Sequence, residues 1–310
     1  MTTATDRLLH RLEWRVVRRL DGRLQGAYRT AQRGSGYDLA GLREYAEGDD
    51  ARHIDWNVTA RMDEPFVREF TEDRELTVWL VLDRSASMLA GAPGRGKDDV
   101  LTELALVLAR LFARGGNRVG ALLYDNGAVR VVRPGVGRAQ ALVVGVAVGS
   151  TRPHARDEGR GRRRRKAPAD DAARPTDLAA MLESVASIAR RRSLVLVVSD
   201  FIGTGDWQRP LARLTHRHEV VALRVVDAAD DALPEVGVVV VEDAETGEQL
   251  VVDSGDPLFQ ARFQAGVRAR DEALVDGMAR AGVPVHRITT DGDLAQQLVA
   301  VVERNRGRRA

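Results

Sequence analysis

The sequence predicts an α/β protein whose mostly parallel central sheet is covered by helices on both faces. Two short runs, 77–82 and 194–198, are apolar apart from Thr77 and have the composition of strands that are buried on both sides. Longer stretches between and after them repeat apolar residues at three- and four-residue steps, which is typical of amphipathic helices. Strands that alternate with helices in this way usually pair in parallel. The order of the two patterns therefore predicts the fold class.

An N-terminal extension precedes the sheet and begins with residues 1–33. This segment includes a predicted amphipathic helix at 6–24, with Leu and Val on one face and mostly Arg on the other. The helix is expected to pack on its own domain. Peripheral contact with an anionic membrane surface is the alternative, because a basic amphipathic helix can lie in that interface.

Residues 34–75 are expected to be a loop-rich segment, dense in charged and aromatic residues. Such a mixture favours a structural network of ion pairs around an aromatic ring over a regular core element. Acid–base catalysis by Asp49, Asp50 and Asp55 is the alternative, since catalytic carboxylates also occur in charged clusters. The candidate members of the network are Arg43, Glu44, Asp49, Asp50, Arg52, Asp55, Trp56 and Arg61.

Residues 76–306 are predicted to form the sheet domain. From their apolar runs, strands are expected at 77–82, 118–124, 128–132, 194–198, 220–226 and 283–288, with a hairpin insert at 236–253. From their periodicity, helices are expected at 98–113, 138–148, 176–191, 207–215, 257–280 and 294–304. Gly115-Gly116 ends the first helix, Asp125-Asn126-Gly127 is a strong hairpin signal, and Thr176-Asp177 can cap the third helix.

A basic insert interrupts this domain at 150–175. The stretch has three prolines and no apolar periodicity, which predicts a mobile loop. Its residues 152–166 sum to +6, whereas the whole chain carries +2, so the rest of the protein is mildly acidic. The run is a solvated loop, an electrostatic docking arm for an acidic partner, or a nucleic-acid site that lacks aromatic residues for base stacking. The docking residues would be Arg160, Arg162, Arg163, Arg164, Arg165 and Lys166.

The composition excludes several classes of protein. At 310 residues, with 44% hydrophobic and 30% charged residues, the chain can bury one substantial core. It has no cysteine, which excludes disulfides, thiol catalysis and cysteine-based zinc sites and suits a reducing compartment. No apolar run approaches the ~20 residues that cross a bilayer, and the first residues lack the apolar core of a signal peptide. A cytoplasmic location is therefore expected.

Oxygen-bearing side chains follow the two most apolar strands. Asp83, Ser85 and Ser87 come after the strand at 77–82, Asp200 comes after the strand at 194–198, and Thr176 opens the helix before that second strand. In open α/β sheets, ligands bind beyond the carboxyl ends of the strands. Hard oxygen ligands suit Mg²⁺ or Mn²⁺, although Asp and Ser alone could simply cap a helix. Their convergence from three loops predicts a cation site.

A glycine-rich run between residues 91 and 98 nearly matches a phosphate-binding loop. Asp98, however, stands where a Ser or Thr would bind Mg²⁺, and a carboxylate there would repel phosphate. The run also begins eight residues after Asp83, whereas a phosphate loop directly follows its strand. Nucleotide binding is therefore not expected.

Two motifs resemble known families. Asp83-Arg-Ser-Ala-Ser87, with Thr176 and Asp200, resembles the metal-ion-dependent adhesion site of von Willebrand factor A domains. The segment Glu47-Gly-Asp-Asp-Ala-Arg-His-Ile-Asp-Trp56 resembles a bacterial group with such a fold, the domain-of-unknown-function family fifty-eight. The similarity covers roughly residues 8–305.

The resemblance has implications for the fold and for the ion. It implies a von Willebrand A-like sheet in which the hairpin at 118–132 contains the single antiparallel strand. It also implies that Ser85, Ser87 and Thr176 ligate a Mg²⁺-like ion while Asp83 and Asp200 hold its waters. In such domains an Asp or Glu of a partner protein completes the coordination. The arginine-rich insert just before Thr176 departs from the broad pattern of the family.

We expect a non-enzymatic, cation-dependent protein-interaction module, since the converging ligands come without a nucleophile–base pair. The resemblance implies partnership with a MoxR-type AAA+ ATPase in chaperone-like complex assembly. One alternative is a metal-dependent phosphohydrolase that uses Asp83 and Asp200, although no histidine closely follows either strand. The other alternative is nucleic-acid binding through residues 152–166.

Overall fold

The computed structural model describes residues 33–46, 49–62, 64–71, 76–89, 94–125, 127–150, 176–203, 205–244 and 247–307. The described part of the chain divides into two compact units, one before Leu76 and one from Leu76 onward. The helix predicted at 6–24 and the basic run from Arg160 to Lys166 lie outside the described residues. Within the described residues, no helix has the length and apolar character needed to cross a membrane.

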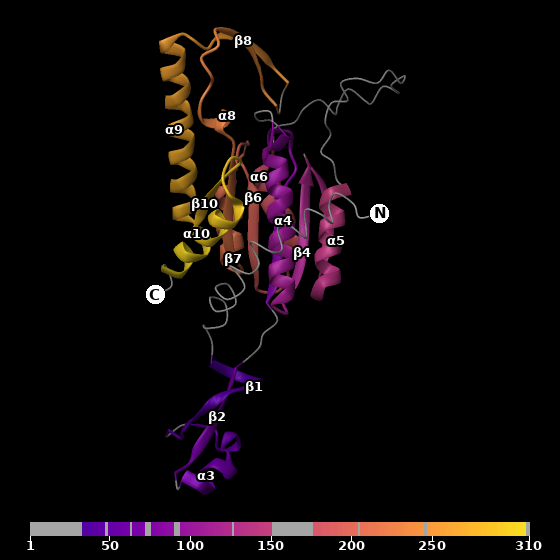
Figure 1. Ribbon diagram of the computed structural model, residues 1–310, viewed down its shortest axis with the longest axis vertical. Helices are drawn as coiled ribbons and strands as arrows, with labels where there is room; N and C mark the ends of the chain where they lie inside the picture. Colours follow the sequence, from indigo (N-terminus) through magenta and orange to yellow (C-terminus); the bar gives the residue numbers. More distant parts are fainter. Residues whose placement is uncertain are drawn as a thin grey trace. The chain divides into compact units, whose positions relative to one another are not determined.

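The larger unit is built on a six-stranded, mostly parallel sheet (Figure 1). In spatial order its strands are β10 (Val285–Thr289), β7 (Glu219–Val226), β6 (Ser193–Ser199), β3 (Thr77–Asp83), β4 (Arg118–Asp125) and β5 (Ala128–Gly135). All neighbours pair in parallel except β4 and β5, which form the antiparallel hairpin expected at Asp125-Asn126-Gly127. The predicted α/β class, with one antiparallel strand, is confirmed.

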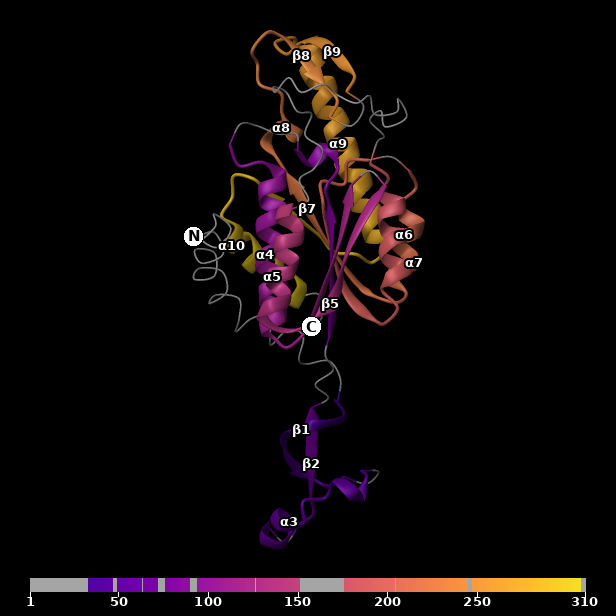
Figure 2. The same ribbon diagram turned by 90° about the vertical axis from the view of Figure 1, so that its right-hand side faces the viewer.

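Helices cover both faces of this sheet, as the sequence predicts. One face carries α4 (Lys97–Arg114), α5 (Gly137–Ser150) and α10 (Leu294–Gly307), and the other carries α6 (Leu178–Ile188), α7 (Gln208–Thr215) and α9 (Pro257–Arg280) (Figure 2). On the second face, Trp79 and Val81 of β3 pack in one apolar cluster with Met181 of α6, Leu211 of α7 and Met278 of α9. The alternate residues of β3 are equally buried, so this strand is the centre of the core.

Polar residues fix where the helices begin and end. The Asp177 carboxylate accepts a hydrogen bond from the Ala180 N–H and caps α6, and Asp256 caps α9 in the same way. The third predicted helix ends at Ile188 and not at residue 191, because the chain must turn back before β6 begins at Ser193. These local signals give the elements of the larger unit nearly the limits that the sequence predicts.

A hairpin and a short helix are inserted between β7 and α9. The helix α8 (Ala228–Asp231) follows β7 directly and was not predicted. The strands β8 (Val238–Glu242) and β9 (Gln249–Asp253) form the antiparallel hairpin expected at 236–253. Because this insert follows the carboxyl end of β7, it emerges on the side of the sheet where the parallel strands end (Figure 2).

The smaller unit corrects the expectation of a loop-rich segment at 34–75. It contains an antiparallel strand pair, β1 (Arg33–Glu44) and β2 (Phe66–Thr71), with η2 (Ala51–His53) and α3 (Trp56–Met62) between them. Val67 of β2 is buried, whereas Leu42 of β1 is 42% exposed. The sequence of β1 contains three glycines and alternates little between apolar and polar residues, so its pattern does not predict a strand.

Candidate metal centre

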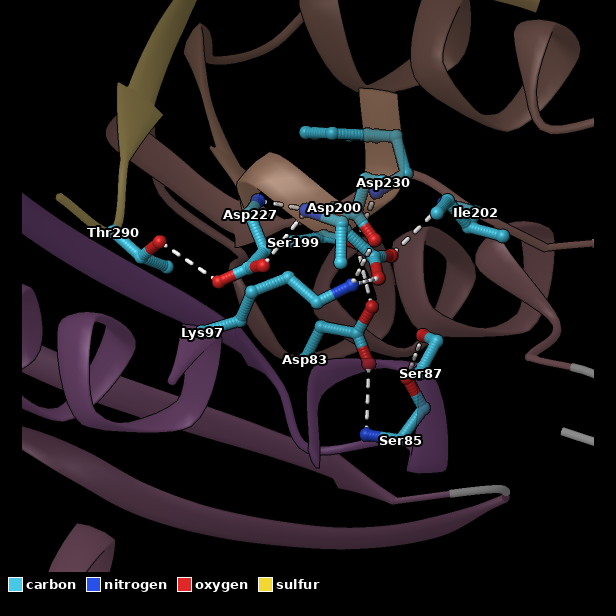
Figure 3. A network of polar contacts seen from close by, with 12 residues as sticks. Asp83, Ser85, Ser87, Lys97, Ser199, Asp200, Ile202, Asp227, Asp230 and Thr290 are labelled. Carbon is cyan, nitrogen blue, oxygen red and sulfur yellow. Dashed lines mark hydrogen bonds and ion pairs between the residues drawn. The ribbon is translucent and has the colours of Figure 1, made fainter. Parts of the chain in front are cut away.

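Asp83 and Asp200 meet because β3 and β6 are parallel neighbours. Leu82 pairs with Val198 in the sheet register, so Asp83 lies beside Ser199 and one residue from Asp200 (Figure 3). The Ser199 hydroxyl donates a hydrogen bond to Asp83 Oδ2 at 2.6 Å. This contact was not predicted, although Ser199 ends the same strand and could have been found by the rule that located Asp200.

The turn after β3 presents the two predicted serines side by side. The Ser85 N–H donates to Asp83 Oδ1 at 3.0 Å, and the short helix η3 (Ala86–Leu89) then positions Ser87. The two hydroxyl oxygens lie 3.2 Å apart, and both residues are buried. Adjacent ligands of an octahedral Mg²⁺ ion, each about 2.1 Å from the metal, are separated by about 3.0 Å. The spacing of the hydroxyls therefore fits two neighbouring positions around such an ion.

Burial penalises a negative charge on Asp83. Its side chain is fully buried, and burial together with the nearby charge of Asp200 raises its pKa to about 7, against hydrogen bonds from Ser199 and Ser85 that lower it. A divalent cation at this position would favour the ionised carboxylate. The electrostatics of Asp83 thus agree with the donor chemistry of the two serines.

Asp200 is held by Lys97, which lies in the glycine-rich run between residues 91 and 98. Its Oδ1 accepts from the Ile202 N–H at 2.9 Å, and its Oδ2 accepts from Lys97 Nζ at 2.9 Å. The same ammonium donates to Asp230 Oδ1 at 3.0 Å (Figure 3). Burial alone would lower the pKa of Lys97, but the charges of the two carboxylates outweigh it and raise that pKa. Lys97 is thus a fixed cation at the edge of the sheet.

The next strand end adds a second acidic pair that was not predicted. Asp227 follows β7 directly, and its Oδ2 accepts from the Thr290 hydroxyl at 2.8 Å, which joins the ends of β7 and β10. The Asp227 N–H donates to Asp230 Oδ2 at 2.9 Å, so Asp230 is held in place within α8. Its position directly after a buried strand was the signal that could have identified Asp227.

Thr176 is buried and packs against the loop that carries Asp200. A Cβ atom at Gly203 would overlap the Thr176 carbonyl oxygen, so only glycine permits this close approach. The structure therefore brings Asp83, Ser85, Ser87 and Asp200 into one polar cluster and places Thr176 beside the Asp200 loop.

The last residues of the glycine-rich run bind protein groups. Arg84 is buried, and its guanidinium forms an ion pair with Asp98 at 3.1 Å and donates to the Thr102 hydroxyl at 3.3 Å. Asp98 and its neighbour Lys97 thus attach the start of α4 to the loops after β3 and β6.

The donor set fits Mg²⁺ or Mn²⁺ better than a softer metal. Among the described residues, no group of three His, Cys, Asp or Glu is placed to hold an ion. A cation here would depend on the hydroxyls of Ser85 and Ser87, with water and carboxylates completing the shell. Oxygen-only coordination with retained water is typical of Mg²⁺.

The charged residues of the smaller unit form separate local pairs. Arg43 donates to both carboxylate oxygens of Asp49 at 2.7 and 2.6 Å, and this contact lowers the pKa of Asp49 to about 2. Asp55 accepts from Arg68 Nε at 2.9 Å, a partner that was not predicted.

Trp56 is 68% exposed, so the expectation of ion pairs closed around its ring is wrong. The other expected members have local or exposed positions: Asp50 accepts from the Arg52 N–H, while the side chains of Glu44 and Arg61 are exposed.

Comparisons with known proteins place the chain in a family. The uncharacterized proteins Mb1516 of Mycobacterium bovis and Rv1480 of Mycobacterium tuberculosis are each 35% identical to it over 300 residues, covering 96% of this chain and 89% of theirs. A solved structure with a similar backbone is that of an aerotolerance-related membrane protein from Bacteroides fragilis with multiple mutations to serines. The two chains share 15% identity with a TM-score of 0.45, and the match covers 75% of this chain and 99% of the other. The conserved hypothetical protein BatB from Bacteroides thetaiotaomicron has 13% identity, a TM-score of 0.42 and the same coverage. Residues 41–273 match the family described as "Protein of unknown function DUF58", and the chain belongs to that family.

Proposed function

We propose that this protein is a von Willebrand factor A-like, divalent-cation-dependent protein-interaction module without catalytic activity of its own. Ser85, Ser87 and Thr176 would ligate Mg²⁺ or Mn²⁺, and Asp83 and Asp200 would hold its waters. The observation that supports this most is the pair of buried serine hydroxyls, 3.2 Å apart, beside the buried carboxylate of Asp83. The strand order, with a single antiparallel strand at one edge, suits such a fold.

An ion held in this way would act as a binding point for a partner protein. Hydroxyl ligands are neutral, so they leave most of the charge of the ion available to an incoming carboxylate. A partner that supplies an Asp or Glu would therefore complete the coordination. We propose that the partner is a MoxR-type AAA+ ATPase in a chaperone-like, complex-assembling role in the cytoplasm.

The hairpin beside this edge offers apolar surface to the same partner. Val238, Val240 and Val251 are 71%, 62% and 67% exposed. Val240 and Val251 pair directly across β8 and β9, so they share one face of the hairpin. Exposed apolar patches of this kind commonly mark protein contacts. A partner would thus bind the cation through a carboxylate and the hairpin through apolar side chains.

Calorimetric titration of Mg²⁺ and Mn²⁺ tests the cation site. The wild type should bind both ions, and Asp83→Ala should abolish binding while its circular dichroism spectrum remains that of a folded protein. Asp276→Asn is the control, because it removes an exposed carboxylate from the far half of α9 and should leave binding unchanged. Absence of binding in both the wild type and Asp83→Ala would refute the proposal.

A further inference from the structure

Lys97 is the most unusual buried residue of the described chain. Its side chain is 1% exposed, and its ammonium lies 2.9 Å from Asp200 and 3.0 Å from Asp230. Lysine is almost never fully buried unless its charge is paired. The two contacts meet that requirement and connect the start of α4 to the loop after β6 and to α8.

The choice of lysine at this position is informative. Of the 47 basic residues in the chain, two are lysines, Lys97 and Lys166, and the rest are arginines. Arginine is normally favoured in buried ion pairs because its planar guanidinium forms several hydrogen bonds. Lysine instead offers a compact point charge. Position 97 therefore holds the side chain whose cationic group most resembles a small ion.

The Lys97 ammonium donates to Asp200 Oδ2, and Asp200 is also one of the carboxylates that would hold the waters of the proposed metal. While Lys97 holds Asp200 Oδ2, it neutralises charge that would attract an ion and repels a second cation nearby. Asp230 is different, because its Oδ2 is fixed by the Asp227 N–H and its Oδ1 faces only the lysine among the contacts described. Asp230 can therefore keep the ammonium when Asp200 turns toward a metal-bound water.

We infer that Lys97 is a built-in competitor of the metal: it shares Asp200 with the bound ion and keeps the affinity of the site for divalent cations low. This inference rests on the proposed function, since it concerns the same cation. The site then binds an ion firmly only when a partner adds a carboxylate. Asp230 acts in the opposite direction, because it draws the ammonium away from Asp200.

Calorimetric titration of Mn²⁺ into full-length variants tests this competition. Lys97→Met should tighten Mn²⁺ binding by about tenfold or more, because it removes a unit positive charge close to the ion. Asp230→Asn should weaken binding several-fold, because the ammonium then pairs with Asp200 alone. Arg280→Met removes the same charge from an exposed position in the last turn of α9 and should leave the affinity as it is in the wild type.

Lys97→Met and Asp230→Asn should change the Mn²⁺ affinity in opposite directions. General damage to the fold would weaken binding in both variants, so the two results together distinguish competition from damage. A Lys97→Met affinity equal to or below that of the wild type would overturn the inference while the cation site itself stands. If Lys97→Met does not fold, Asp230→Asn decides: weaker binding supports the inference and unchanged binding overturns it. Absence of Mn²⁺ binding in every variant would refute the proposed function and the inference together.

Discussion

Replacing Ser199 by alanine should destabilise the protein most at a pH where Asp83 is ionised. The Ser199 hydroxyl donates to Asp83 Oδ2 at 2.6 Å and accepts from the Phe201 N–H at 2.8 Å, and both Ser199 and Asp83 are completely buried. The substitution removes the donor of one buried carboxylate oxygen and the acceptor of one buried amide. Each such loss costs about 1–3 kcal/mol, and more when the group left behind is charged.

The charge on Asp83 sets the pH dependence. The pKa of Asp83 is about 7 in the folded protein and has an ordinary value of 3.8. The folded state therefore binds the proton more tightly than the unfolded state, so this group stabilises the metal-free protein fully below about pH 4. The contribution is lost as the pH rises through about 7. Because the orphaned oxygen is neutral at pH 5 and charged at pH 8, Ser199→Ala should lower the free energy of unfolding by about 2 kcal/mol at pH 5 and about 4 kcal/mol at pH 8.

Urea unfolding followed by circular dichroism, in EDTA at pH 5 and pH 8, measures both values. Ser193→Ala is the matched control, because Ser193 is 2% exposed at the other end of β6 and donates at 2.7 Å to the carbonyl oxygen of Arg191, which does not titrate. This control should lose the same stability at both pH values. Equal losses for Ser199→Ala at pH 5 and pH 8 would refute the assignment of the titrating charge to Asp83.

Three further predictions concern other parts of the chain. Asp49, whose pKa is lowered to about 2, stabilises the smaller unit fully above pH 3.8 and loses this effect as the pH falls through 2. NMR should therefore place the titration midpoint of Asp49 near 2, and a midpoint near 3.8 would contradict its ion pair with Arg43. Gly203→Ala should lower the free energy of unfolding by more than about 1 kcal/mol, because its methyl group overlaps the Thr176 backbone, whereas Gly149→Ala in open space should not destabilise the protein. Deletion of residues 152–166 should leave calorimetric Mg²⁺ binding unchanged, and any salt-sensitive binding of nucleic acid by the wild type should disappear with the deletion.

The strands of the sheet, and the two carboxylates at their ends, could be predicted because both depend on local patterns. The continuous apolar runs of β3 and β6 are visible in the sequence, and their parallel pairing brings Asp83 and Asp200 to the same edge. The rule that ligands gather at strand ends needs only the order of the elements. It does not need the contacts of any side chain.

The partners of these carboxylates could not be predicted because they depend on register and on the direction of a helix. Lys97 lies 103 positions from Asp200 and 133 from Asp230 in the chain, and its side chain reaches them only because α4 begins beside the end of β6. Ser199 contacts Asp83 through the register of two strands 116 positions apart. Periodicity identifies elements, but it contains no information on which side chains face each other across them.

The paired contacts of Lys97 also restrict how the sequence of the family can vary. A neutral residue at position 97 would leave the two carboxylates of Asp200 and Asp230 without their buried cation, so it is tolerable only if position 230 also becomes neutral or if a metal is always bound. Positions 97 and 230 should therefore change together among relatives. Relatives that keep the lysine should recruit their ion together with a partner, and relatives that have lost it should carry the ion permanently.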